Sequence, residues 1–175
     1  MDVNSVAVQV SDFATSGISD IWLWVGNFVV LLVLTVVMLL FSYKGGRGGI
    51  ISLILALYVG YAIYIVFPYT DQIIAAGGTT MIKAVISVII YGISTFIPFI
   101  FIQRLTGGGF GVLSVVPRFA LSFLAAAFLL ALSYHVFDIS NIYTFPAPLD
   151  TLFAPQGYFF WWFIAPLAGL IFLVH

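Results

Sequence analysis

Residues 28–67 of this 175-residue chain read FVVLLVLTVVMLLF-SYKGGRGG-IISLILALYVGYAIYIVF. Two apolar runs, 28–41 and 50–67, flank a short glycine-rich turn that carries Lys44 and Arg47. A helix needs about 20 residues to cross a bilayer. The second run approaches this length by itself, and the first run does so when the apolar residues that precede it are included. The stretch is therefore typical of a transmembrane helical hairpin, and its basic turn is expected in the cytoplasm.

The composition extends this interpretation to the whole chain. Hydrophobic residues make up 63% of the sequence and charged residues only 6%, and the mean hydropathy is +1.24. A soluble domain carries far more charge, so these values indicate an integral membrane protein. The apolar segments are continuous and do not alternate with polar residues, which favours a helical bundle over an outer-membrane barrel.

The same composition excludes several classes of partner and chemistry. The chain has no cysteine, which excludes disulfides, thiolate metal ligands and cysteine nucleophiles. A net charge of −1 argues against a nucleic-acid partner, and the expected surroundings are the lipid bilayer.

We predict an all-α, polytopic membrane protein with a short outer segment, 1–20, followed by a single transmembrane domain, 21–175. The five predicted spans cover residues 21–41, 50–67, 81–102, 119–137 and 158–174. The N-terminal segment lacks the basic start of a signal peptide, and it would be an interfacial helix or disordered. The stretch 139–157 is rich in proline and aromatic residues, so we expect it to lie along the membrane surface or against the bundle.

The distribution of charge predicts the orientation of the chain. Four of the five cations fall in the turns that follow spans one and three, namely Lys44, Arg47, Arg104 and Arg118. All six aspartates fall on the opposite side of the predicted topology, and glutamate is absent. Because cytoplasmic loops carry an excess of lysine and arginine, the N-terminus is expected outside and the C-terminus inside.

Small residues recur every four positions in two of the predicted spans. They are Gly48, Ser52, Ala56 and Gly60 in span two, and Ser122 and Ala126 in span four. Residues with this spacing share one face of a helix, and small side chains let another helix approach closely in lipid. We therefore expect helix packing along these faces, and a homo-oligomer or a subunit of a larger membrane complex as the product.

One group of ionisable residues lies near the predicted outer ends of the helices: Lys83, His135, Asp138 and Asp71. The group could be a proton- or ion-responsive site, because histidine titrates near neutral pH. The favoured interpretation is a set of salt bridges that fixes helix packing at the outer interface. No paired carboxylates, metal-ligand spacing or Ser-His-Asp arrangement can be assembled, so we predict no catalytic, metal or cofactor site and no enzyme activity.

The turn and the start of span two, residues 43–53, read YKGGRGGIISL. This stretch resembles the hairpin of the colicin V production (CvpA) family, in which a basic Gly-Arg-Gly-type turn joins two apolar helices. The resemblance covers about residues 26–138. It implies a bacterial inner-membrane protein linked to export or envelope maintenance, and it transfers no catalytic residue.

Two functions are therefore expected. The first is a small inner-membrane protein that works by assembling with itself or with partner proteins. The alternative is a small channel or an ion-coupled transporter subunit that uses the outer cluster of Lys83, His135, Asp138 and Asp71.

Overall fold

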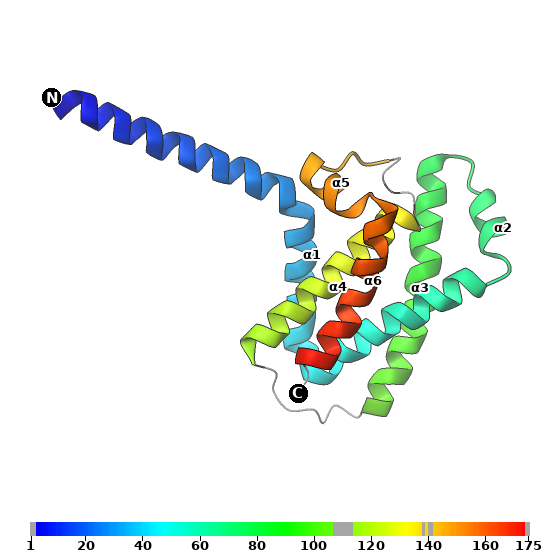
Figure 1. The fold of residues 1–175 in the computed structure, drawn as a ribbon. Helices are drawn as coiled ribbons and strands as arrows, with labels where there is room; N and C mark the ends of the chain where they lie inside the picture. Colours follow the sequence, from blue (N-terminus) through cyan, green and yellow to red (C-terminus); the bar gives the residue numbers. More distant parts are fainter. Residues whose placement is uncertain (1–2, 107–113, 138, 140–141, 174–175) are drawn as a thin grey trace.

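The computed structural model describes residues 3–106, 114–137, 139 and 142–173, with side chains from residue 25 to 105 and from 114 onward in those ranges. All regular structure in these ranges is helical. The helices are α1 (Val3–Val66), α2 (Thr70–Ala75), α3 (Thr80–Thr106), α4 (Val115–His135), α5 (Ala147–Phe153) and α6 (Gln156–Leu173) (Figure 1).

Four helical segments are long and apolar enough to cross a membrane: Val25–Val66, Thr80–Leu105, Val115–His135 and Gln156–Leu173. The predicted class of polytopic helical membrane protein is thereby confirmed. Both spans predicted over 21–41 and 50–67 fall within α1. Its apolar part has 42 residues and would measure about 63 Å as a straight helix, roughly twice the hydrocarbon thickness of a bilayer. That length is sufficient for two crossings.

Gly46 is the point at which α1 turns back on itself. Its φ of 64° and ψ of −164° are non-helical, and such a positive φ favours glycine because there is no Cβ to clash. Gly46 divides the apolar part of α1 into a first arm (residues 25–45) and a second arm (residues 47–66), and the second arm runs obliquely across the bundle toward α2 (Figure 1). The part of α1 before residue 25 leads away from the bundle (Figure 1).

Helix α4 is the centre of the bundle. Within the membrane-spanning segment of α4, 56% is buried inside the protein, compared with 11% for the spanning segment of α6. The first arm covers one side of α4, where Leu31 packs with Ala126 and Leu130. The second arm covers another side through Ile50 and Ile54. Helix α6 also packs closely on α4 at Gly169. If residue 169 carried a Cβ, that atom would lie only 2.5 Å from Leu124 Cδ1 of α4, so there is no room for a side chain in the present packing.

The small residues of the second arm face other helices of the same chain. Gly48, Ser52, Ala56 and Gly60 are all buried. A Cβ on Gly60 would lie 2.8 Å from the Cα of Thr95, so the second arm and α3 touch almost backbone to backbone at this point. Ser122 and Ala126 are likewise buried within the bundle. These predicted packing faces are therefore already used inside one chain.

The described charged residues separate toward the two ends of the bundle, except that Lys83, in the first turn of α3, lies at the same end as Asp71. The Arg118 guanidinium lies 4.5 Å from the ring centroid of Tyr43, which places the start of α4 beside the turn that contains Lys44 and Arg47. The C-terminal end of α3, which carries Arg104, lies at this same end (Figure 1). Helices α2 and α5, which carry Asp71 and Asp150, lie at the opposite end (Figure 1).

The proline- and aromatic-rich stretch closes that opposite end of the bundle. Phe145 packs against the ring of Tyr134, with ring centroids 4.6 Å apart, and Leu149 and Phe153 of α5 are fully buried. The indole of Trp162 in α6 donates a hydrogen bond to the Leu152 carbonyl at 2.9 Å. Helix α5 thus lies against the bundle and joins α4 to α6.

Candidate functional site

The structure places the predicted outer cluster in two separate settings. Lys83 and Asp71 are both exposed near the corner between α2 and α3. The His135 ring is half-buried at the end of α4, where its Nε2 lies 2.8 Å from the Phe153 carbonyl and its ring lies against Phe159. Within the described ranges, no hydrogen bond or ion pair joins these three residues. Asp138, the fourth member, lies outside the described residues.

A polar pair that the sequence analysis did not identify holds α5 in place. The Tyr134 hydroxyl donates a 2.6 Å hydrogen bond to Oδ1 of Asp150, across 16 positions of sequence. No short motif signals this pair, because it is formed by the return of the chain after α4. With the contact between His135 and Phe153, it makes the junction of α4 and α5 partly polar.

Loss of this hydrogen bond should weaken the junction. We expect Tyr134→Phe to lower the free energy of unfolding by about 1–3 kcal/mol, because the partly buried Asp150 carboxylate would lose its partner. A matched control is Tyr143→Phe, which removes a hydroxyl from a half-exposed ring. Unfolding of the purified protein by denaturing detergent would measure both, and equal stability of the two variants would contradict the assigned role.

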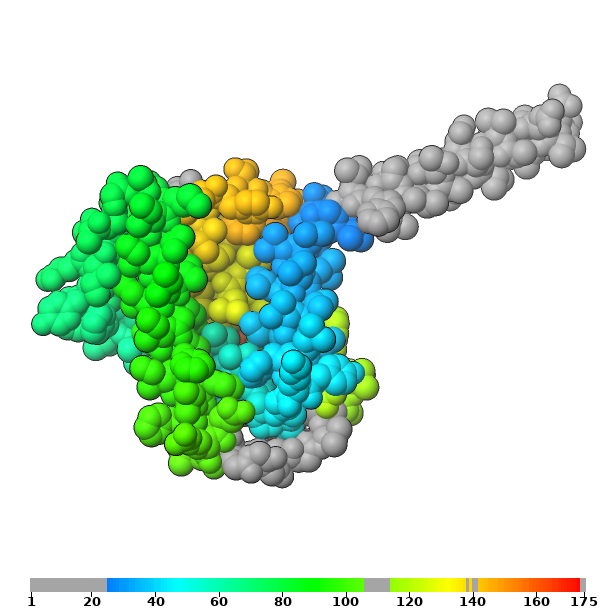
Figure 2. Space-filling view, turned by 180° about the vertical axis from the view of Figure 1, so that it is seen from behind, coloured from blue at the N-terminus to red at the C-terminus, as the bar shows by residue number. Residues whose placement is uncertain are grey.

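A groove opens between the first arm and α3, and its floor is formed by α4 together with Leu53 and Leu57 of the second arm. Figure 2 shows it as a hollow between the blue first arm and the green α3, with α4 visible behind. Two adjoining cavities of about 450 and about 410 Å³ compose it, and both are lined by Val88, Leu129 and Phe137. We call this continuous surface the lateral groove.

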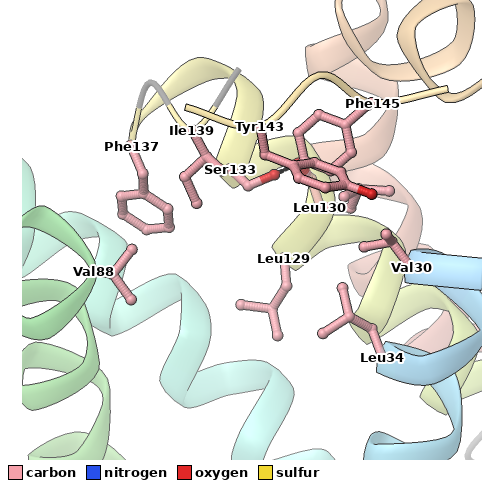
Figure 3. Close-up of a pocket in the computed structure, with 10 residues that line it drawn as sticks. All are labelled: Val30, Leu34, Val88, Leu129, Leu130, Ser133, Phe137, Ile139, Tyr143 and Phe145. Carbon is pink, nitrogen blue, oxygen red and sulfur yellow. Dashed lines mark hydrogen bonds between the residues drawn. The ribbon is translucent and has the colours of Figure 1, made fainter. Parts of the chain in front are cut away.

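The walls of the lateral groove are almost entirely hydrocarbon and aromatic. On the first arm they extend from Val30 to Phe41, and on α3 from Val88 to Phe99. Ser133 also lines the groove, but its hydroxyl is directed to the Leu130 carbonyl at 2.6 Å (Figure 3). The groove therefore suits an apolar occupant.

Both ends of the lateral groove are bounded by aromatic residues. Near the turn at Gly46, the rings of Phe41 and Phe99 meet edge to face with centroids 5.5 Å apart. At the other end, Ile139, Tyr143 and Phe145 form a roof over the cavity (Figure 3). The long side between the first arm and α3 stays open, so an occupant would enter from the plane of the membrane.

In the described portions of the chain, no three histidine or aspartate side chains gather closely enough to hold a metal ion. In comparisons with known proteins, no family model, curated protein or solved structure matches the chain.

Proposed function

We propose that this protein acts by assembly within the bilayer, binding a second copy of itself or a partner protein through the first arm of α1. The proposal includes a bacterial inner-membrane location with the turn at Gly46 in the cytoplasm and the N-terminus outside. The location, and a role in export or envelope maintenance, rest on the resemblance of residues 43–53 to the CvpA family.

The observation that carries the proposal is the outward face of the first arm. This face consists of side chains that are 39–59% exposed, namely Val25, Val29, Leu32, Val33, Val36, Val37 and Leu40. The opposite side of the same arm packs on α4 through Leu31. The first arm thus leaves one face free along most of its length.

The side chains of this face favour contact with another helix. Apolarity alone would not distinguish a protein contact from a lipid contact, because lipid tails are as apolar as leucine. In a helix, valine is almost fixed in one rotamer, as is isoleucine, so such side chains lose little entropy when a neighbour packs on them. The exposed residues of α3 include larger side chains such as Ile89, Ile93 and Phe101 beside its valines. Five of the seven residues of the outward face are valines, whose shorter side chains let another helix approach more closely.

Cysteine crosslinking tests the proposal directly, because the native chain has no cysteine. We expect membranes that contain Val33→Cys or Val37→Cys to give a disulfide-linked dimer on mild oxidation, since a disulfide requires Cα atoms within about 7 Å. A matched control is Ile93→Cys, which lies on α3 and has an exposure of 58%, close to the 57% of Val33.

The relative dimer yields at the three positions distinguish ordered self-assembly from random collision. Dimer formation at Val33 and Val37 in clear excess over Ile93 would support a homo-oligomer formed through the outward face. Equal yields at all three positions would indicate random collision and would contradict self-assembly through this surface. In that case, association with a partner protein could be tested with a photoreactive residue at position 33.

The channel or transporter alternative has less support from the geometry. It requires Lys83, His135 and Asp71 to act together, but His135 contacts Phe153 and Phe159 whereas Lys83 and Asp71 are exposed elsewhere. The outward face is the better supported basis for function.

A further inference from the structure

The lateral groove is a different surface from the outward face, and no described segment of the chain fills it. We infer that it binds one acyl chain of an anionic phospholipid, with the headgroup at the end near Lys44 and Arg104. This inference goes beyond the proposed assembly, because it concerns a lipid and uses the other side of the first arm.

The dimensions of the groove favour an acyl chain over a helix. One wall runs from Val30 to Phe41 on the first arm, and the other from Val88 to Phe99 on α3. In each, the last residue is 11 positions after the first, which corresponds to a helix rise of roughly 16 Å. This is about half of the 30 Å hydrocarbon thickness, the depth that the lipid tails of one leaflet fill. A transmembrane helix would need the full thickness, and the roof of Ile139, Tyr143 and Phe145 stands in its path.

Gly92 supplies an independent argument for an occupant. It lies inside α3, where glycine is less favourable than alanine by about 1 kcal/mol, and it lines the lateral groove. A Cβ on Gly92 would meet no atom of the chain within 4 Å, in contrast to the tight contacts at Gly60 and Gly169. Close helix packing therefore explains those two glycines but not Gly92, whose missing side chain keeps the groove open.

Charge at one end of the groove indicates the headgroup. Lys44 follows Phe41 by one helical turn, and Arg104 follows Phe99 by little more than one turn. Both side chains are exposed and lie beyond the lining residues at this end, Lys44 after the first arm's last lining residue and Arg104 after that of α3. Two cations so placed complement the phosphate of an anionic lipid whose tail enters through the open side and extends toward the roof.

Photolabelling in vesicles tests the inference on the full chain. The probe is a phosphatidylglycerol with a diazirine in the middle of one acyl chain, and mass spectrometry locates the labelled residues. We expect labelling of Leu129, on the groove floor, to exceed labelling of Ile93 on the lipid-facing side of α3. Gly92→Phe should reduce Leu129 labelling about tenfold, because the phenylalanine ring would fill the space in the groove that the acyl chain occupies.

Control variants separate loss of binding from loss of folding. Ile93→Phe adds a ring of the same size beside Gly92 but at an exposed position, and it should leave Leu129 labelling unchanged. Val88→Phe, with the exposed Val85→Phe as its control, provides a second groove-filling variant. Unchanged labelling of Leu129 in folded Gly92→Phe and Val88→Phe would overturn the inference. A disulfide-linked dimer formed by Leu129→Cys would also overturn it, because a second chain would then occupy the groove.

The headgroup assignment has its own test. With the same diazirine chain on phosphatidylcholine, we expect severalfold weaker labelling of Leu129, and the double variant Lys44→Gln/Arg104→Gln should remove the difference between the two lipids. Equal labelling by both lipids in the unaltered protein would overturn the headgroup assignment. Crosslinking at Val33 is independent of both results, so failure of the lipid inference is distinguishable from failure of the proposed assembly.

Discussion

Replacement of Gly60 by leucine is expected to destabilise the folded bundle by about 3 kcal/mol, at the upper end of the usual cost of overpacking. Even the first added carbon would lie 2.8 Å from the Cα of Thr95, and a backbone cannot yield as a flexible side chain can. The second arm and α3 would have to separate along their shared contact. Unfolding by denaturing detergent, followed through the fluorescence of the four tryptophans, would measure the change.

The matched comparison uses alanine at two glycines that both lie inside helices. Gly60→Ala should still be destabilising, whereas Gly92→Ala should be neutral or stabilising by up to about 1 kcal/mol, because its Cβ enters open space and alanine favours the helix. Equal stability of the two alanine variants would contradict the close approach of the second arm to α3.

Replacement of Phe153 by alanine should have a similarly large effect, lowering the free energy of unfolding by about 3–5 kcal/mol. The ring is fully buried and stacks on Trp162 with centroids 4.6 Å apart. Its removal would leave a cavity at the point where α4, α5 and α6 meet. We also expect faster proteolysis between residues 142 and 157, because α5 would lose its main anchor.

The neighbouring Leu152 provides the control for this variant. Its side chain is 40% exposed, and its carbonyl can still accept the hydrogen bond from Trp162 after substitution. Leu152→Ala should therefore stay within about 1 kcal/mol of the unaltered protein. If Phe153→Ala proved as stable as Leu152→Ala, α5 would not be anchored as the structure shows.

Features that depend on local sequence could be predicted well. The apolar runs on either side of SYKGGRGG indicate spanning helices directly, because segment length and hydropathy are local properties. Gly46 is the residue at which the chain turns, within the basic stretch that marked the turn. The burial of Gly48, Ser52, Ala56 and Gly60 also follows from their spacing.

Features that depend on the arrangement of several helices could not be predicted. The four-residue spacing around Gly60 identifies a close-packing face but not its partner, which is Thr95 of the same chain and not a second copy. The hydrogen bond between Tyr134 and Asp150 depends on the path of the intervening segment. The lateral groove is a space left between three helices and a roof, and no residue pattern in one helix could reveal it.

The central place of α4 has a consequence for biogenesis. Both arms of α1 and all of α3 leave the ribosome before α4 does, since chains emerge from the N-terminus at roughly 5–20 residues per second. For several seconds the buried surfaces of Leu31, Ile50 and Ile54 have no α4 to cover them. The early helices must therefore wait in lipid, or beside an insertion factor, until synthesis passes residue 135.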